Sequence, residues 1–374
     1  MIPVSRPWFG AEEESAVVAT LRSRWVAEGP RVAEFEKAFA AYLGQAEAIA
    51  VSSGTTGLHL ALQALGLGPG DEVIVPSLSF IATANCVVHA GATPVFADVD
   101  LATYNLSVAS AEAALSSRTR AILLVHQAGL PADLDAFRAL AARAGVTLVE
   151  DAACAIGSRL RGRLVGGDSA IGVFSFHPRK LLTTGEGGMI VTSDATLAAR
   201  LRSLRNHGVS MSAYDRHAAG AAIIESYGTV GYNFRMTDLQ GAVGLVQLGR
   251  VEDFVTRRIE LGERYTRAFN GHPGIVVPSV APDVRFNYQT YQVRLTEKSQ
   301  IARDALMRAF LEQGISTRRG IMASHREPSY RERPLRVPLP ATETANRDAI
   351  VLPLYHDLEP HDQDRVIKTA LELV

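Results

Sequence analysis

The stretch TRAILLVHQAGLPADLDAFRALAARAGVTLVED, residues 119–151, decides the fold class of this chain. It contains two short apolar runs, Thr119–His126 and Val146–Val149, on either side of a segment with helical periodicity. A strand, a helix and a second strand in this order form a βαβ unit, whose two strands lie parallel in one sheet. The stretch therefore predicts an α/β protein.

The same alternation extends from about residue 47 to residue 195. Strands that are buried on both faces are continuously apolar rather than alternating. We therefore predict a large domain with a mostly parallel central sheet covered by helices, preceded by N-terminal helices at Glu12–Leu21 and Arg31–Leu43. The other apolar runs of this region are Ala48–Val51, Glu72–Val75, Thr93–Phe96, Ile171–Ser175 and Gly188–Thr192.

From Thr237 the pattern predicts a long connecting helix that ends near Asn270. A smaller α+β domain is expected after it. A chain of 374 residues exceeds what a single compact core usually reaches, so we predict domains at residues 1–245 and 246–374. The elements expected in the smaller domain are strands at Tyr288–Leu295 and Ile315–Arg319 and helices at Ala302–Glu312 and Asp362–Leu373.

Composition argues against several classes of protein. The formal net charge is −1, with Lys and Arg spread along the chain, so we expect no nucleic-acid partner. No apolar run approaches the ~20 residues of a membrane span, and MIPVSRPWFG, residues 1–10, lacks an apolar signal core. We expect a cytoplasmic protein with no membrane partner. The two cysteines, Cys86 and Cys154, argue against a disulfide framework and a metal site, and we interpret both as small buried residues.

In open parallel sheets, ligands bind beyond the carboxyl ends of the strands, so polar residues at those ends are candidates. The turn Ser53-Gly54-Thr55 follows one predicted strand, and its glycine and the free amides of the next helix favour a phosphate. An ordinary helix cap would have the same sequence. Asp151 follows another strand and needs a cationic partner such as a pyridinium nitrogen, unless it pairs with an arginine or caps a helix.

Lys180 lies in FSFHPRK, residues 174–180, with Ser175 before it and TTGEGG, residues 183–188, after it. A lysine on such a constrained loop can hold a neutral amine against a carbonyl group, whereas an isolated lysine is usually a solvated surface group. The segment GYNFR, residues 231–235, combines hydrogen-bond donors with aromatic rings. It belongs either to a site or to an ordinary domain hinge.

Together these motifs resemble the DegT/DnrJ/EryC1/StrS family of sugar aminotransferases, which depend on pyridoxal 5'-phosphate (PLP). The resemblance implies the fold type I, aspartate-aminotransferase-like fold, a cofactor that alternates between PLP and pyridoxamine 5'-phosphate, and a homodimer with shared active sites. The motifs that carry it cover nearly the whole chain: WVAEGP (25–30), SGT (53–55), PSLSF (76–80), EDAA (150–153), SFH (175–177) with Lys180, TGEGG (184–188) and GYNFR (231–235).

The resemblance also implies roles for individual residues. Lys180 is expected to carry the cofactor as a Schiff base and to shuttle a proton, and Asp151 to keep the pyridine nitrogen protonated. Phe80 is expected to stack on the cofactor ring. The expected phosphate contacts are Ser53, Gly54, Thr55 and Ser175, with Asn233 from the neighbouring subunit. Candidate substrate contacts, each of which could instead be a local structural residue, are Gly29, His177, Glu186, Arg319, His325 and Tyr330.

Two positions, Cys154 and Lys180, indicate how the reaction of this chain compares with that of the family it resembles. The family commonly has Gln or His where Cys154 stands, near the phenolic oxygen of the cofactor. A thiol is a weaker donor, so that contact is either lost or made by another group. A related branch that removes a sugar hydroxyl has histidine in place of Lys180, so the lysine favours amine transfer over that dehydration.

We therefore predict a ping-pong aminotransferase that takes nitrogen from an amino acid, expected to be L-glutamate, and passes it to a keto-sugar, expected to be a nucleotide-linked ketohexose. Arg318 and Arg319 are basic residues that could bind a nucleotide diphosphate. One alternative is a PLP aminotransferase with a different acceptor, such as an aminocyclitol ketone. Another is a regulatory or DNA-binding protein that keeps the fold, which the neutral charge and Lys180 argue against.

Overall fold

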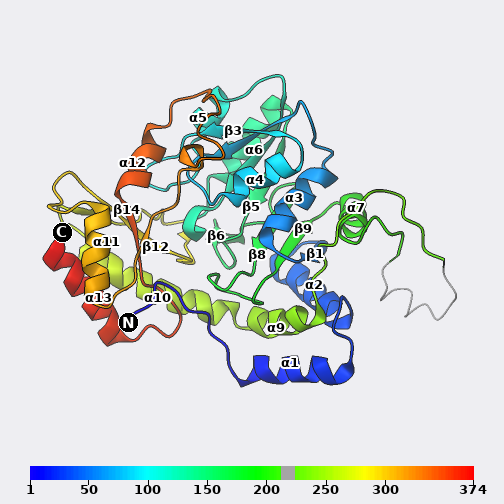
Figure 1. Cartoon of the computed structure of the whole chain (residues 1–374), viewed down its shortest axis with the longest axis horizontal. Helices are drawn as coiled ribbons and strands as arrows, with labels where there is room; N and C mark the ends of the chain where they lie inside the picture. The colour runs from blue at the N-terminus through cyan, green and yellow to red at the C-terminus, as the bar shows by residue number, and fades with distance from the viewer. Residues whose placement is uncertain (212–223) are drawn as a thin grey trace.

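The computed structural model describes residues 1–211 and 224–374. Within these residues the central sheet has seven strands in the order β1-β9-β8-β5-β4-β2-β3, and only β9 runs antiparallel to its neighbours (Figure 1). The predicted α/β fold with a mostly parallel sheet is confirmed. The strands are β1 Glu47–Val51, β2 Glu72–Pro76, β3 Thr93–Ala97, β4 Thr119–Val125, β5 Thr147–Asp151, β8 Ile171–Ser175 and β9 Gly188–Thr192.

Helices follow the strands and pack on the sheet, which keeps the strand side chains away from water. In β5 and β8, for example, Val149 and Val173 are fully buried. The helix after β1 begins at Gly54, because Ser53 caps it by accepting a hydrogen bond from the amide of Thr56. The helices of this region are α3 Gly54–Ala64, α4 Ala82–His89, α5 Val108–Ala113, α6 Leu134–Ala144 and α7 Ala195–Arg205.

The two predicted N-terminal helices are α1 Ala11–Ser23 and α2 Pro30–Leu43, and both contact α9 Asp238–Gly249. The long helix predicted from Thr237 to Asn270 is in fact two helices, α9 and α10 Val251–Phe269, with a break at Arg250. Arg250 leaves the helical conformation where its guanidinium pairs with Glu13 and lies over the Trp8 ring. Tertiary contacts therefore divide a segment whose local pattern is continuously helical.

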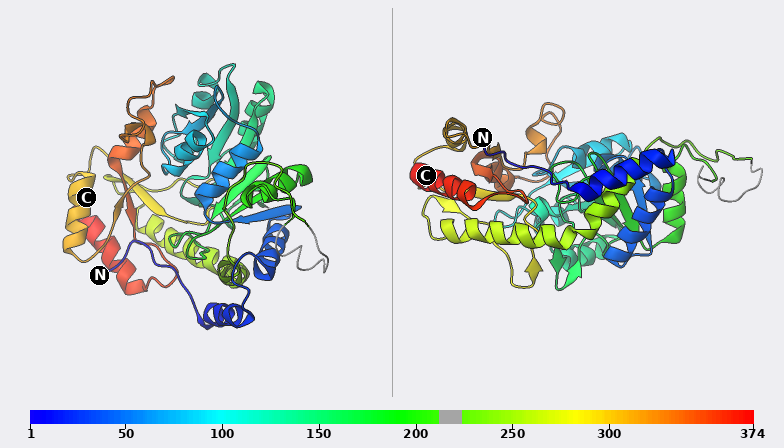
Figure 2. Two further views of the ribbon diagram at one scale, coloured as in Figure 1. Left: turned by 45° about the vertical axis from the view of Figure 1, so that its right-hand side comes forward. Right: turned by 90° about the horizontal axis from the view of Figure 1, so that it is seen from below.

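The C-terminal region has a four-stranded antiparallel sheet in the order β10-β12-β14-β13, seen beside α11 and α13 in Figure 2. The sequence did not predict β14 Ala349–Leu352, and the expected strand at Ile315–Arg319 is reduced to β13 Arg318–Arg319. The remaining elements are β6 Arg159–Leu160, β7 Arg163–Leu164, β10 Ile275–Val276, β11 Val284–Arg285, β12 Tyr291–Leu295, α11 Arg303–Glu312, α12 Pro340–Asp348 and α13 Pro360–Leu373.

Among the described residues, β11, β6 and β7 form a third, small sheet, and the two larger hydrophobic cores lie against the two larger sheets. Helix α10 crosses from one core to the other: Val251 and Phe254 belong to the core of the large sheet, whereas Tyr265 and Phe269 belong to that of the C-terminal sheet. The chain start returns to the second core, where Ile2 is buried. A division of the chain at residue 245 stays a prediction.

Glu72, at the start of β2, ties the C-terminal part of the chain to the large sheet. Its buried carboxylate accepts two hydrogen bonds from Arg336, at 2.7 and 2.9 Å, one from Arg118 and one from Ser116. These contacts, that of Arg336 above all, hold the pKa of Glu72 at about 2 despite burial.

We expect Glu72→Gln to lower the free energy of unfolding by about 2–3 kcal/mol at pH 7, because the arginines lose their counter-ion. A carboxylate with a depressed pKa contributes its full stability above its unfolded pKa of 4.5 and loses it as the pH falls towards 2. The difference between parent and variant in urea denaturation should therefore shrink below pH 4.5. The exposed Glu112, changed to Gln, is the control and should cost under about 0.5 kcal/mol. An equal loss at pH 7 and pH 3.5 would contradict this account.

Among residues 1–211 and 224–374, no helix is long and apolar enough to cross a membrane. In the same part of the chain, no group of three or more His, Cys, Asp or Glu side chains is arranged to hold a metal ion.

Candidate active site

A cavity of about 350 Å³ lies at the carboxyl ends of the central strands. Strands β5 and β8 reach it with their last residues, Asp151 and Ser175, as expected for the ligand-binding edge of a parallel sheet. The C-terminal sheet closes it from the other side, with Arg318 and Leu352 in the wall. The residues that line the cavity thus come from both of the larger hydrophobic cores.

Asp151 is buried at the end of β5 and faces this cavity. Its carboxylate accepts hydrogen bonds from the Thr83 hydroxyl at 3.2 Å and from the amide of Ala153 at 3.1 Å. Burial raises the pKa of Asp151, and these two contacts and the charge of Lys180 only partly oppose that rise. A buried carboxylate with neutral hydrogen-bond partners fits a cationic ligand group such as a protonated pyridine nitrogen.

Lys180 reaches the same cavity from the loop after β8. The loop is closed on itself, because the amide of Phe176 donates to the carbonyl of Gly187 at 2.9 Å and that of Thr184 to the carbonyl of Phe176 at 3.1 Å. From outside the loop, the Gln289 side chain accepts from the amide of Leu181. Lys180 is therefore held on a constrained loop, as its sequence context predicts.

Cys154 is the nearest hydrogen-bond partner of this lysine: its Sγ lies 3.0 Å from Lys180 Nζ. The interpretation of both cysteines as small buried residues is right for Cys86 but wrong for Cys154, which is half-buried and lines the cavity. No local pattern turns the side chain of Cys154 towards the lysine, and only the family resemblance placed this position near the cofactor.

The amino end of α3 meets the end of β8 at the cavity wall. A Cβ atom on Gly54 would lie 2.7 Å from the Cβ of Ser175, so only glycine allows this approach. The first amides of a helix have no intrahelical acceptor and point outward, where they bind anions. Ser53, Gly54, Thr55 and Ser175 together therefore fit a phosphate group.

We expect Gly54→Ala to weaken the binding of PLP by at least about tenfold and to destabilise the protein by about 2 kcal/mol, since the new methyl group displaces Ser175. Titration of PLP into cofactor-free protein measures the first effect. Gly68→Ala is the control, because a Cβ there meets no atom within 4 Å. Parent-like PLP affinity of Gly54→Ala would show that the phosphate binds elsewhere.

Phe80 lies at the cavity just before α4 with 63% of its surface exposed, which is unusual for a phenylalanine. An exposed ring at a cavity is available to stack on a flat ligand. Thr83, three residues later, bonds to Asp151, so one short segment supplies both a ring face and a contact to the buried carboxylate.

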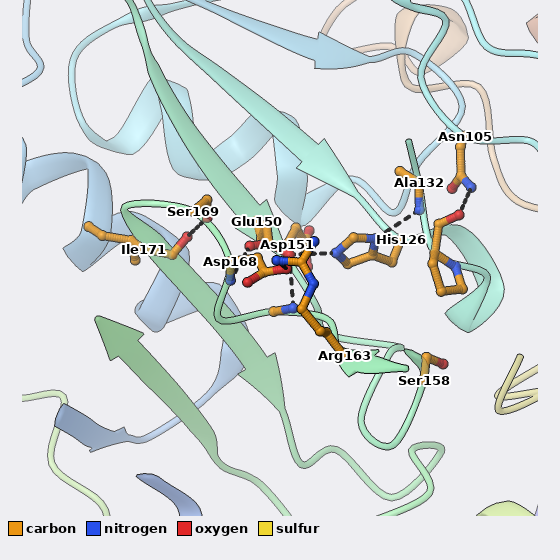
Figure 3. Close-up of polar contacts among 12 residues, drawn as sticks. Asn105, His126, Ala132, Glu150, Asp151, Ser158, Arg163, Asp168, Ser169 and Ile171 are labelled. Carbon is orange, nitrogen blue, oxygen red and sulfur yellow. Dashed lines mark hydrogen bonds and ion pairs between the residues drawn. The ribbon is translucent and has the colours of Figure 1, made fainter. Parts of the chain in front are cut away.

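Behind Asp151, a second buried carboxylate anchors the strand ends, as Figure 3 shows. The Nδ1 atom of His126 accepts from the amide of Ala132 at 3.0 Å, so its Nε2 carries the hydrogen and donates to Glu150 at 2.9 Å. Glu150 also accepts from the amides of Gly166 and Asp168. Burial opposes ionisation of Glu150, but these bonds outweigh it and lower its pKa. The backbone amide of His126 donates to the carbonyl of Asp151 at 3.2 Å, so this network lies directly beside Asp151.

The candidate substrate residues separate into two groups. His177, Glu186 and Arg319 line the cavity, and the Nε2 of His177 lies 3.9 Å from Glu186. Burial lowers the pKa of His177; the charge of Glu186 opposes this effect, whereas the neighbouring cations add to it. These three residues are in place to contact a substrate.

The other candidates do not line the cavity. The imidazole of His325 lies between Ser77 and Glu343, at 2.6 and 2.9 Å, and the buried Tyr330 bonds to Asn85 at 2.6 Å. Gly29 caps α2 against the ring of Trp25. Their hydrogen bonds and packing are internal, so the cavity gives no support for substrate contact by these three residues, which stays a prediction. Asn233 is exposed and outside this cavity, which leaves its predicted contact across a dimer interface as a prediction.

Sequence reasoning missed Thr83, His126, Gln289 and Arg179. Thr83 lies in a helix and His126 at the end of a strand, where both residue types are commonly structural. No local pattern marks such residues, because their contacts come from distant parts of the chain.

A mostly parallel sheet that presents a constrained lysine and a buried aspartate to one cavity defines the class of PLP-dependent transferases of fold type I. The chain belongs to the DegT/DnrJ/EryC1/StrS aminotransferase family, whose sequence model matches residues 8–371. It is therefore a PLP-dependent aminotransferase.

Solved structures agree with this assignment. The chain is similar to the aminotransferase TlmJ from Streptoalloteichus hindustanus, with 36% identity over 99% of this chain and 98% of that one and a TM-score of 0.91. It is similar to S. venezuelae DesV, solved in complex with a ketimine intermediate, with 39% identity over 97% and 94% of the chains and a TM-score of 0.88. The PMP form of the putative sugar aminotransferase Spr1654 from Streptococcus pneumoniae shares 27% identity over the full length of both chains, with a TM-score of 0.93.

Proposed function

We propose that this aminotransferase moves an amino group from L-glutamate to a nucleotide-linked ketohexose in two half-reactions at one site. The observation that carries the proposal is the pair Lys180 and Asp151, which face one cavity at the ends of β5 and β8. The keto-sugar acceptor is supported by the resemblance to sugar aminotransferases and by the putative sugar aminotransferase among the similar structures. Cationic and aromatic side chains in the same cavity suit a large, anionic substrate.

Each residue of the site has a part in this proposal. When bound, PLP supplies an electron-accepting ring that takes up the electron pair of a broken substrate C–H bond. Asp151 would keep a proton on the ring nitrogen, because a buried carboxylate with neutral hydrogen-bond partners favours a cationic ligand group. The amine of Lys180 would hold the cofactor through its aldehyde group, and its Nζ would carry the proton to and from the substrate carbon. Phe80 would stack on that ring.

The α3 amides and Ser175 would hold the phosphate, and we expect Asn233 of a second subunit to complete the cradle. A homodimer with shared sites follows from this proposal. The exposed ring of Phe80 and the exposed position of Asn233 are compatible with it.

Two separate additions test the proposal. Glutamate alone should convert the cofactor, with loss of its absorbance near the visible edge and release of one 2-oxoglutarate per site. A nucleotide-linked ketohexose, added after glutamate is removed, should restore the absorbance and yield an amino sugar detectable by mass spectrometry. Restoration only by a cyclitol ketone would favour the alternative acceptor, and a chain that binds no PLP would overturn the enzymatic function.

A further inference from the structure

The thiol of Cys154 and the amine of Lys180 are in direct contact, with Sγ and Nζ 3.0 Å apart. Both side chains line the cavity at the ends of β5 and β8. Within residues 1–211 and 224–374, neither of these two atoms forms another hydrogen bond, and Nζ forms no ion pair. The contact therefore pairs two nucleophiles, a sulfur and a nitrogen, with each other.

The sulfur of Cys154 is accessible from the cavity, whereas that of Cys86 is not. Cys154 is half-buried, and the cavity of about 350 Å³ that it lines admits small molecules. Cys86 is fully buried, and its Sγ donates to the carbonyl of Thr83 at 3.2 Å. Burial raises the pKa of the Cys86 thiol, and the charge of Asp151 adds to that rise. Because oxidants attack accessible thiolates, Cys154 is the cysteine of this chain that they reach.

Backbone contacts hold the two residues in place. The side chain of Asn287 donates to the carbonyl of Cys154 at 2.9 Å, and the amide of Lys180 donates to the carbonyl of His177 at 2.8 Å. The lysine side chain has a flexible four-carbon stem. A covalent bond between Sγ and Nζ therefore needs a rotation of this stem and no movement of the sheet.

Resting on the function proposed above, in which Lys180 presents a free amine to the cofactor, we infer that Cys154 and Lys180 form a redox-controlled modification site. Hydrogen peroxide oxidises the Cys154 thiol to a sulfenic acid and is reduced to water. The nitrogen of Lys180 then attacks that sulfur: an N–S bond forms, the S–O bond breaks, and the hydroxyl group leaves as water with a proton from the amine. The product is a sulfenamide that cross-links the two side chains.

A small thiol reverses the modification in two exchange steps. The first thiol attacks the Cys154 sulfur, forms a mixed disulfide and returns the amine of Lys180 with a proton. A second thiol attacks the mixed disulfide, releases the Cys154 thiol and leaves as a disulfide of the two small thiols. Gln and His, which are common at position 154 in the family, have no sulfur and cannot form this link.

The cross-link and the cofactor compete for the same nitrogen. A lysine nitrogen held in a sulfenamide is no longer a primary amine, so it cannot bind the aldehyde of PLP. Conversely, an amine that is already bound to that aldehyde cannot attack the sulfur of Cys154. The modification therefore blocks protein whose Lys180 is free and spares protein whose Lys180 holds the cofactor.

Mass spectrometry of the cofactor-free protein tests the site without any turnover. Hydrogen peroxide should lower the mass of the protein by about 2 Da, the two hydrogen atoms lost in the cross-link, and should join the peptides that contain residues 154 and 180. Dithiothreitol should restore the mass. The uptake of PLP, followed by absorbance, should be lost with the cross-link and should return after reduction. Loading with PLP beforehand should slow the cross-linking by at least about tenfold.

Variants separate this link from other products of oxidation. Cys86→Ala should cross-link like the parent, because a disulfide between the two cysteines would cause the same change in mass. Cys154→Ser and Lys180→Ala should each form no cross-link. After peroxide treatment, Cys154→Ser should take up as much PLP as the same variant without treatment. If Cys154→Ser does not fold, Cys154→Ala allows the same comparison.

Three results would overturn the inference. The first is oxidation of Cys154 to a sulfinic or sulfonic acid without a link to Lys180. The second is an equal loss of PLP uptake after peroxide treatment in the parent and in Cys154→Ser. The third is cross-linking of the PLP-loaded protein at the rate of the cofactor-free protein. Failure of the proposed function is distinct, because the cross-link is detected in protein that never receives glutamate, whereas that failure is a parent enzyme that glutamate does not convert.

Discussion

Lys180→Ala is expected to lower the rate of glutamate-dependent amination by at least about 10³-fold, because the variant lacks both the amine that binds the cofactor and the base that moves the proton. The visible absorbance of the loaded enzyme should change as well. Borohydride treatment of the parent should fix the cofactor on a single peptide. The chain has only four lysines, Lys37, Lys180, Lys298 and Lys368, so peptide mapping gives an unambiguous answer.

Lys298→Ala is the matched control, since this lysine is exposed and outside the cavity. It should keep the parent rate and the parent absorbance. If Lys180→Ala completes amination at the parent rate, or if borohydride labels another lysine, the mechanism proposed here is wrong.

Asp151→Asn has the second large effect and tests a charge without altering shape. We expect the amination rate to fall about 10²- to 10³-fold, since an amide cannot hold the ring nitrogen in its protonated form. The cofactor-free variant should nevertheless be at least as stable as the parent at pH 7. Burial raises the pKa of Asp151, so the folded state binds more protons than the unfolded state above pH 3.8, and its charge costs stability as the pH rises through that window.

The neighbouring carboxylate provides the contrast. Glu150 has a lowered pKa, because hydrogen bonds from His126 and the Gly166 amide outweigh its burial. Glu150→Gln should therefore destabilise the cofactor-free protein in urea denaturation at pH 7. A general disturbance of β5 would not change the free energy of unfolding in opposite directions for substitutions at two adjacent residues. A strong loss of stability in cofactor-free Asp151→Asn would contradict the assignment of Asp151 to a cationic ligand.

The sequence predicted the large sheet well, because buried parallel strands leave a direct signal. All seven apolar runs became strands, and β8 Ile171–Ser175 and β9 Gly188–Thr192 have the predicted bounds. The strands of the C-terminal region were harder to predict. Its strand β14 has four residues, and β13 has two, so neither contains enough positions for a period to be recognised. The break at Arg250 also escaped prediction, since its cause is a contact with Glu13.

The site residues, too, were predictable where a local pattern marks them and not where only tertiary contacts do. Ser53, Asp151, Ser175 and Lys180 were found because they follow apolar runs, and parallel strands bring such positions to one edge of the sheet. His325 and Tyr330 were chosen for their chemical type, and the structure places neither of them at the cavity. The type of a residue does not determine where its side chain points. Packing turns both side chains into the protein: His325 forms hydrogen bonds with Ser77 and Glu343, and Tyr330 forms one with Asn85.

The sequence by itself therefore determined the class of fold, the family resemblance and the order of the residues that end the strands, including Lys180 on its constrained loop. Only the tertiary structure decided which side chains share the cavity. It placed Cys154 beside Lys180, set His126 and Glu150 behind Asp151, and brought Arg318 from the C-terminal sheet to the cavity that Arg179 also lines. The physical reason is that local periodicity sets the elements, whereas the contacts of a side chain depend on packing between elements distant in the chain.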